Sequence, residues 1–207
     1  MDRAPTDKKT ELLRVIRDEV WNLTSSPLYE YRKANNYYPV IGQGNHDTGI
    51  MFIGEGPGKN EAETGTPFCG AAGKLLDELL ASINLPRKDV YITNIIKDRP
   101  PQNRDPLPEE IKIYAPFLDR QIEIIQPKII ATLGRFSMAY IMERFGLQNE
   151  LKPISVIHGK AFSINHPSGF PKIIIPLYHP AVAIYDRKQK ETLLKDFQII
   201  NTLTRED

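Results

Sequence analysis

The chain has 207 residues, enough for one domain with a sizeable hydrophobic core. Its 27 Lys and Arg residues nearly balance 26 Asp and Glu residues, so a nucleic-acid partner would need a local basic patch. A single cysteine excludes an intrachain disulfide and suits a reducing compartment. Without a long apolar run or a signal-peptide core, the sequence predicts a cytoplasmic protein with no membrane partner.

The first third of the sequence contains one strand followed by a glycine-rich loop. Residues 1–9 are polar and expected to be frayed, and residues 10–21 predict an amphipathic helix. After a turn-rich region, four apolar residues at 50–53 predict a strand that is buried on both faces. The chain then breaks into Gly54-Glu55-Gly56-Pro57-Gly58, where glycines permit close approach of a ligand to the backbone. Leucines at helical spacing predict a helix over residues 75–83.

Strands and helices alternate through the remaining sequence. Further strands are predicted at 90–96, 129–133 and 173–177, and further helices from Pro108, from just after Gly134 to about 145, and around 193–203. A loop is expected to hold residues 187–190, and residues 155–165 fit either a hairpin or a single strand with a turn. This alternation predicts one α/β domain over residues 1–207, a three-layer α/β/α sandwich with a short, mostly parallel central sheet.

Polar or glycine residues follow the carboxyl ends of four predicted strands. Glu55, Asn94, Gly134 and His179 stand at these positions. Because a parallel sheet brings such ends to one edge, where ligands bind in open α/β sheets, we expect them to form one site.

Two common phosphate-binding loops are excluded at the glycine-rich loop. Ile53 and Asn60 stand where a Walker loop needs its first glycine and its Ser or Thr. Lys59 stands where a dinucleotide fingerprint needs its last glycine. By itself, the loop fits a tight strand-to-helix turn as well as it fits a binding site.

Three segments together resemble family 4 uracil-DNA glycosylases. The first motif of that family is similar to Gly54–Gly58, Glu61, Gly65–Phe68 and Gly70–Leu76, with the loop length preserved. The basic loop also follows the family pattern, with Thr93-Asn94, Lys97, Arg99-Pro100-Pro101, Asn103-Arg104 and Pro106. His179-Pro180-Ala181 resembles the second motif. The resemblance covers roughly residues 20–200 and implies the uracil-DNA glycosylase-like fold.

The resemblance implies a monofunctional enzyme of base excision repair. Such an enzyme flips deoxyuridine out of DNA and hydrolyses its N-glycosidic bond. The implied partner is uracil-containing DNA, with free uracil as the product. We expect a monomer that associates with the nucleoid through DNA.

Three residues are expected to carry the reaction. Asn94 offers a donor and an acceptor side by side, which match the adjacent N–H and carbonyl of uracil but not the opposite pattern of cytosine. His179 is expected to donate a hydrogen bond to the ring O2 as negative charge develops there; we prefer it to His166, which lies in turn-forming sequence. Glu55 is the expected carboxylate near the anomeric carbon, positioning water or stabilising the cation.

Further contacts to base and DNA are expected around this group. Phe68 can stack on the extruded base, although alone it fits a core phenylalanine equally well. The segment 181–185 is a candidate wedge for the gap left by the flipped base. The remaining base-binding candidates are Gly54, Gly56, Pro57, Pro180 and Ala181. The DNA-binding candidates are Lys97, Arg99, Asn103, Arg104, Gly134, Arg135, Ser137, Arg187 and Lys188, with a phosphate expected at the helix that follows Gly134.

The sequence departs from family 4 at the cofactor. Members of that family carry a four-iron cluster on four cysteines, and the matching positions here hold Leu23, Ser26, Asp98 and Tyr114. Cys69 lies elsewhere, and one thiolate cannot hold such a cluster. We therefore predict no metal and no cofactor, with Tyr114 and Leu23 packing into the space as a hydrophobic substitute.

Two other functions stay open at this point. Loss of the cluster could accompany loss of excision, which would leave a uracil- or nucleic-acid-binding module on the same fold. The chain could instead be a glycosylase for another deaminated base, such as hypoxanthine.

Overall fold

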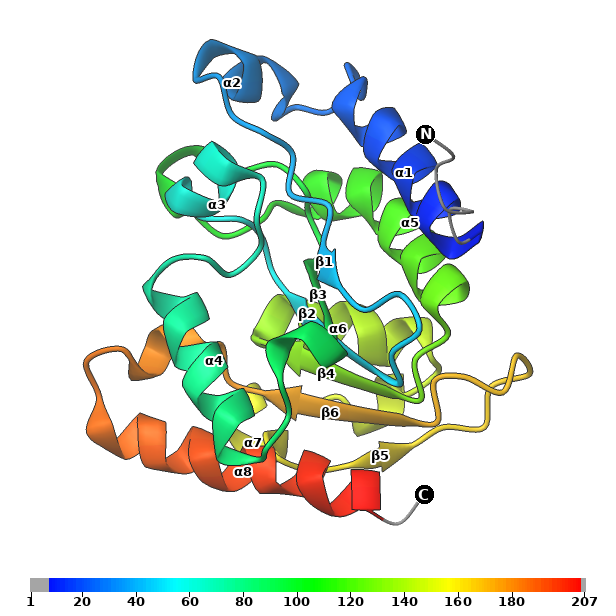
Figure 1. Cartoon of the computed structure of the whole chain (residues 1–207), viewed down its shortest axis with the longest axis vertical. Coiled ribbons are helices and arrows are strands. Elements are labelled where there is room, and N and C mark those ends of the chain that lie inside the picture. Colours follow the sequence, from blue (N-terminus) through cyan, green and yellow to red (C-terminus); the bar gives the residue numbers. More distant parts are fainter. Residues whose placement is uncertain (1–7, 206–207) are drawn as a thin grey trace, which may run out of the picture.

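A six-stranded sheet forms the centre of the computed structural model, which describes residues 8–205 (Figure 1). The strand order is β1-β3-β2-β4-β6-β5. The strands are β1 (Gln43–Gly44), β2 (Ile50–Gly54), β3 (Tyr91–Asn94), β4 (Ile129–Leu133), β5 (Phe162–Ser163) and β6 (Ile173–Leu177). The four central strands are parallel, while β1 and β5 pair antiparallel at the two edges. The prediction of an α/β fold with a mostly parallel sheet is confirmed.

Helices cover both faces of this sheet. The α-helices are α1 (Lys8–Trp21), α2 (Tyr29–Ala34), α3 (Lys59–Thr64), α4 (Ala71–Ser82), α5 (Pro108–Ile125), α6 (Arg135–Arg144), α7 (Ile154–Ile157) and α8 (Arg187–Arg205). Short 3-10 turns are η1 (Arg87–Asp89), η2 (Pro101–Asn103), η3 (Gln148–Glu150) and η4 (Pro180–Ala183). No helix within residues 8–205 is long and apolar enough to cross a membrane.

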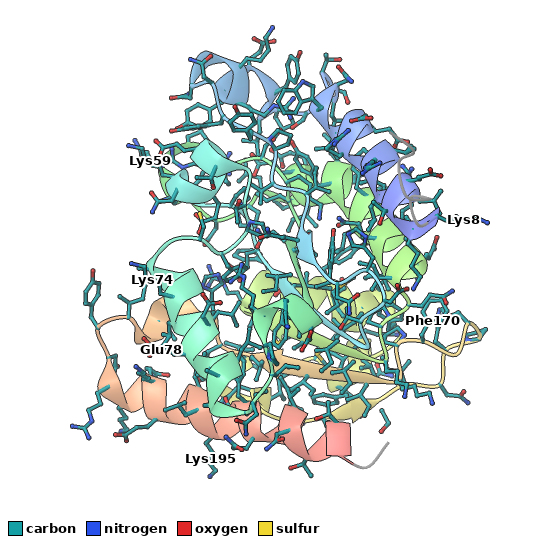
Figure 2. All side chains as sticks on the ribbon, viewed as in Figure 1. Lys8, Lys59, Lys74, Glu78, Phe170 and Lys195 are labelled. Carbon is teal, nitrogen blue, oxygen red and sulfur yellow. The ribbon has the colours of Figure 1, made fainter. Side chains whose placement is uncertain are left out.

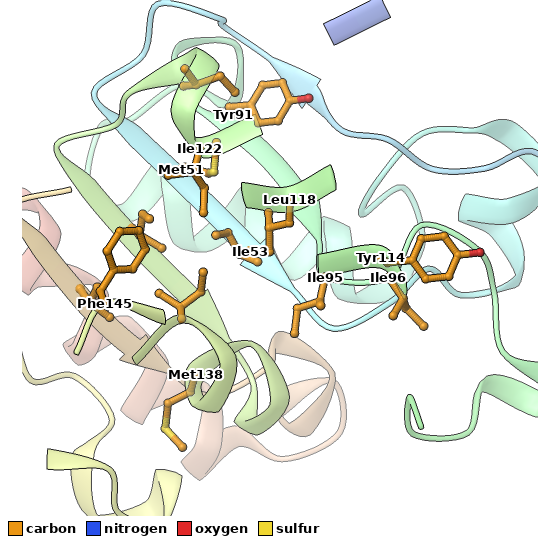
Figure 3. Close-up of a cluster of buried hydrophobic side chains, with 14 of the residues drawn as sticks. Met51, Ile53, Tyr91, Ile95, Ile96, Tyr114, Leu118, Ile122, Met138 and Phe145 are labelled. Atoms are coloured by element: carbon orange, nitrogen blue, oxygen red, sulfur yellow. The ribbon is translucent and has the colours of Figure 1, made fainter. Parts of the chain in front are cut away.

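Each central strand feeds two hydrophobic cores because successive side chains point to opposite faces. Met51 and Ile53 of β2 pack with α1, α5 and α6, in the cluster that Figure 3 shows. Ile50 and Phe52 pack on the other face with α4 and α8, where the Phe52 ring stacks on Phe197 at a centroid distance of 5.8 Å. All four side chains are buried. The continuous apolar run of β2 is therefore the consequence of a strand covered on both faces.

Two sequence-based expectations at element boundaries were wrong, and one open alternative was settled. Lys8 and Lys9 belong to α1 and are not frayed; the rest of the segment expected to fray, residues 1–7, lies outside the described residues. Residues 155–165 match the second of their two predicted alternatives, a single strand with a turn, because the turn at 158–159 separates the end of α7 from the edge strand β5. The stretch 187–190 begins α8 because the Asp186 carboxylate accepts hydrogen bonds from the backbone N–H groups of Lys188 and Gln189, which caps the helix.

Candidate active site

A cavity of about 470 Å³ lies at the carboxyl edge of the parallel strands. Glu55, Phe68, Asn94 and His179 all line it, so the structure brings these four candidates together. Gly56, Pro57 and Ala181 also line the cavity, whereas Gly54 and Pro180 are buried outside its lining. The parallel pairing of β2 with β3, of β2 with β4 and of β4 with β6 places the strand ends side by side.

The Asn94 side chain is buried with both polar atoms unsatisfied. It ends β3 at 1% exposure, and neither Nδ2 nor Oδ1 finds a hydrogen-bond partner within the described chain. A buried amide without partners is costly, so the arrangement favours a ligand that supplies an acceptor and a donor together. Gly54 pairs with Asn94 in register, and a Cβ at Gly54 would lie 2.3 Å from Asn94 Oδ1. Glycine is therefore required beside this amide.

Phe68 forms an aromatic wall next to Asn94. Its ring stacks on that of His179, with centroids 5.5 Å apart and planes inclined by 28°. The backbone of Phe68 has φ of +49°, which is unusual for a bulky residue and indicates local strain. Gly73 allows this turn, because a Cβ there would lie 1.8 Å from the Phe68 carbonyl oxygen. The chain thus holds the ring at the cavity at some conformational cost.

His179 is held in a single tautomer by the turn that follows it. The backbone N–H of Ala181 donates to Nδ1 of His179 at 3.2 Å. With Nδ1 accepting, the proton of the neutral ring resides on Nε2, which is then a donor. Burial lowers the pKa of His179 to about 4, so the ring is neutral at physiological pH.

Glu55, directly after β2, caps the N-terminus of α6 with its carboxylate. Its Oε1 accepts a hydrogen bond of 3.0 Å from the backbone N–H of Phe136, at the start of α6. Burial raises the pKa of Glu55, the Phe136 hydrogen bond opposes that shift, and nearby Asp105 adds to it. A half-buried carboxylate with one oxygen fixed in this way can present its other oxygen to water.

The expected phosphate site at this helix is therefore wrong. The Glu55 carboxylate already occupies the N-terminus of α6, and a second anion there would be repelled. Ser137 is buried and its hydroxyl donates to the carbonyl oxygen of Gly134, so neither residue is available to DNA. Arg135 is exposed and pairs with Asp105.

Lys97 is also not a DNA contact. The side chain is completely buried, and burial places the pKa of Lys97 well below its usual value. Its Nζ donates to Thr93 Oγ1 at 2.8 Å, to the Asn94 carbonyl oxygen at 2.7 Å and to Gln121 Oε1 at 2.6 Å. Lys97 therefore supports the strand end that carries Asn94 from inside the protein.

The other basic candidates differ in how their charge is used. Arg99 donates to two neutral groups, the Tyr37 hydroxyl and the Asn103 side-chain oxygen, which leaves its charge available to an anion. Arg104 instead makes a two-pronged ion pair with Glu110. Arg187 pairs with Glu191 on the exposed start of α8, and Lys188 is exposed beside it.

Two exposed lysines of the first motif, one of which lines the cavity, were missed in the sequence. Lys59 begins α3 and lines the cavity, and Lys74 lies on α4; Figure 2 shows both extending on the same side of the molecule. The signal was present, because both lysines directly follow a glycine of the first motif.

The four positions matched to cluster cysteines do not fit an iron–sulfur cluster. Leu, Ser, Asp and Tyr offer no thiolate, and no group of three or more His, Cys, Asp or Glu suited to a metal occurs within residues 8–205. The Tyr114 ring packs in the apolar cluster as expected, but its buried hydroxyl also bonds Ser26 and Asp98, so the substitute is not purely hydrophobic. Leu23 does pack against the neighbouring apolar cluster.

Comparison with known proteins points to one family. Residues 41–200 match the model of the uracil DNA glycosylase superfamily. The chain is similar to the type-4 uracil-DNA glycosylase of Archaeoglobus fulgidus, at 45% identity over 173 residues and 84% of each chain. It is also similar to the type-4 enzyme of Saccharolobus solfataricus, at 44% identity over 90% of this chain and 83% of that one. The type-4 uracil-DNA glycosylase of Thermotoga maritima is 38% identical over 92% of this chain and 93% of that one.

Proposed function

The chain belongs to the uracil DNA glycosylase superfamily and is a hydrolase that excises uracil from DNA in base excision repair, and we propose that Glu55, Asn94 and His179 carry this reaction. The observation that carries the proposal is the buried, unpartnered amide of Asn94 in the cavity wall. Uracil supplies what this amide lacks, because its N3–H donates to Oδ1 while its O4 accepts from Nδ2.

Stacking and shape complete the base pocket. The extruded uracil lies against the Phe68 ring, and the Gly54–Pro57 loop allows its edge to approach the backbone. Cytosine would place a donor against Nδ2 and an acceptor against Oδ1, which would leave buried groups unpaired. The same amide therefore both binds uracil and rejects cytosine.

His179 and Glu55 act on the two partners of the breaking bond. When the bond between C1′ and the base nitrogen breaks, its electron pair moves onto the uracil ring. The Nε2–H of neutral His179 donates to O2 and stabilises that charge. Glu55 faces the sugar, stabilises its developing positive charge and orients the water that adds to C1′. The water proton is released, the uracil anion takes up a proton, and free uracil and an abasic site remain.

DNA is held by exposed groups around the cavity. Arg99, Lys59 and Lys188 are proposed phosphate contacts, because each is an exposed or partly exposed cation. Lys59 lines the cavity, and Arg99 directly precedes Pro100, which also lines it. Tyr185, with a side chain 98% exposed directly after η4, is the best candidate within residues 181–185 for the wedge. We propose that the enzyme works on cytoplasmic DNA as a monomer and without a cofactor.

The test is excision from a uracil-containing oligonucleotide, followed by hot alkali to break abasic sites. Wild type is expected to cut only at the uracil, and Asn94→Ala should be slower by roughly 100- to 1,000-fold. Asn22→Ala, an exposed asparagine just past the end of α1, is the matched control and should retain full activity. Tight binding of uracil-DNA without product would instead support a non-excising binding module. Cutting at hypoxanthine but not uracil would overturn the substrate assignment.

A further inference from the structure

Three of the four positions matched to cluster cysteines are joined by hydrogen bonds inside the protein. Tyr114 on α5 donates from its hydroxyl to Asp98 Oδ2 at 2.6 Å. Its oxygen also lies 2.7 Å from Ser26 Oγ, so the Ser26 hydroxyl is the donor in that contact. Ser26, Asp98 and Tyr114 are 5%, 0% and 0% exposed. Figure 3 shows Tyr114 beside Ile96 with its hydroxyl turned away from the apolar cluster.

Arg32 supplies the positive charge that balances the buried Asp98 carboxylate of these hydrogen-bonded residues. Its guanidinium lies 3.3 Å from Asp98 Oδ1, and the two side chains are 6% and 0% exposed. The same guanidinium donates to the carbonyl oxygens of Val20 and Trp21 at the C-terminal end of α1. It also lies over the Tyr29 ring, with Cζ 5.1 Å from the ring centroid. One arginine thus neutralises Asp98 and satisfies helix-end carbonyl groups.

The contacts join three segments that are distant in sequence. Ser26 lies in the connection between α1 and α2 and Arg32 lies on α2, while Asp98 belongs to the loop after β3 and Tyr114 lies on α5. These are the same segments that carry the positions matched to the cysteines. In the protein interior, a polar group whose members are all paired constrains geometry more strictly than apolar packing does.

We propose that Ser26, Arg32, Asp98 and Tyr114 form a metal-free clamp that takes the place of the iron–sulfur cluster. The clamp fixes the loop between Asn94 and Arg99 to α5 and to the α1–α2 connection. Metal–thiolate bonds are replaced by one buried ion pair and a chain of hydrogen bonds. The fold of this chain therefore depends on neither iron nor a reduced environment for cluster assembly. The clamp is independent of the proposed roles of Glu55, Asn94 and His179.

The hydroxyl of Tyr114 is the most specific point to test. Tyr114→Phe keeps the buried ring but removes both hydrogen bonds, and we expect the Tm to fall by roughly 5–10 °C. Tyr140→Phe is the matched control, since its hydroxyl bonds Asp119 at the edge of the protein; its Tm should fall by less than about 3 °C. Hydrogen exchange of residues 95–104 should accelerate in Tyr114→Phe alone. Equal, small effects in both variants would overturn the clamp.

Iron content provides a second, independent test. Wild-type protein should contain no stoichiometric iron after anaerobic purification, and chelators should leave its Tm unchanged. The combined variant Leu23→Cys, Ser26→Cys, Asp98→Cys and Tyr114→Cys, reconstituted anaerobically with iron and sulfide, should bind about four iron atoms per chain. Stoichiometric iron in the wild type, or a folded four-cysteine variant that takes up none, would overturn the replacement. Because neither measurement uses excision, failure here is distinguishable from failure of the proposed function.

Discussion

Lys97 lies directly behind Asn94, with its Nζ 2.7 Å from the carbonyl oxygen of Asn94. The same ammonium group bonds Thr93 on the strand and Gln121 on α5. Gln121 in turn donates to the carbonyl oxygen of Ile41 and to the Tyr91 hydroxyl. A completely buried lysine with three well-placed acceptors holds the end of β3 in one position, so the amide that meets uracil is pre-organised.

Lys97→Met should show whether Lys97 positions the Asn94 amide or only stabilises the fold. The substitution keeps the apolar stem but leaves three buried acceptors without their donor, so excision should slow by roughly 10- to 100-fold. We expect inhibition by free uracil to weaken as well, because the Asn94 amide would no longer be held in place. Lys59→Met, at the exposed rim, makes the same substitution at a surface lysine and should affect DNA binding but not inhibition by free uracil. Unchanged inhibition in Lys97→Met would contradict the positioning role.

Gly54→Ala should damage the site without removing a catalytic group. A Cβ at Gly54 would lie 2.3 Å from Asn94 Oδ1 and 2.7 Å from the Phe68 ring. Because both groups must move, uracil excision should fall by at least about 100-fold, judged by the cost of small displacements at an active site. Gly49→Ala is the matched control, since nothing lies within 4 Å of its added Cβ. Similar excision rates for the two variants would show that the tight packing at Gly54 is irrelevant to activity.

The acid limb of the pH–rate profile should report Glu55. Burial and the Asp105 charge raise the pKa of Glu55 above its ordinary value of 4.5. If the carboxylate form is active, kcat/KM should be constant at high pH and fall as pH decreases through this raised pKa. Asp105→Asn removes a negative neighbour and releases Arg135 from its ion pair, so the limb should move to lower pH.

Asp77→Asn is the control for this shift. Asp77 also pairs with an arginine, Arg87, but it lies on the outer side of α4, outside the cavity lining. Its replacement should leave the acid limb where it is in the wild type. Movement of the limb to higher pH in Asp105→Asn would show that Glu55 does not control it.

Local pattern was sufficient for most of the central sheet, although β3 ends at Asn94, two residues before the predicted end of the strand. The apolar runs of β4 and β6 have the predicted bounds, because a strand covered on both faces leaves a continuous signal. Parallel pairing of those strands then brings Glu55, Asn94 and His179 to one cavity. Their catalytic roles stay predictions, since geometry alone does not measure a rate.

Long-range partners explain what the sequence could not reveal. Lys97 lies in a basic loop, so the sequence alone predicted a surface residue. The fold places Gln121, 24 positions away, beside its amine. The N-terminus of α6 resembles a phosphate site until Glu55, 81 positions earlier, occupies it. The sequence alone predicted a purely apolar role for Tyr114, but the fold brings Ser26, 88 positions away, to its hydroxyl. Each error came from assigning a polar side chain by its neighbours in sequence, although its partner was brought near only by the fold.

The lowered pKa of His179 predicts how the stability of the folded protein depends on pH. Because burial lowers the pKa of His179 to about 4, its ring should not titrate between pH 8 and 5 when followed by NMR. The unfolded chain has an ordinary histidine pKa of about 6.5, so it binds more protons than the folded chain between pH 6.5 and 4. Stability should therefore fall as pH decreases through this window.

His179→Ala should remove that part of the pH dependence. Urea unfolding at pH 7.5 and at pH 5 is expected to show a smaller loss of stability for the variant than for the wild type. Excision should slow by roughly 100- to 1,000-fold at both pH values, because the Nε2–H donor to the uracil O2 is lost. His166→Ala, outside the cavity, is the control for loss of a histidine. A wild-type ring that becomes protonated near pH 6.5 would contradict the neutral donor and require an imidazolium in its place.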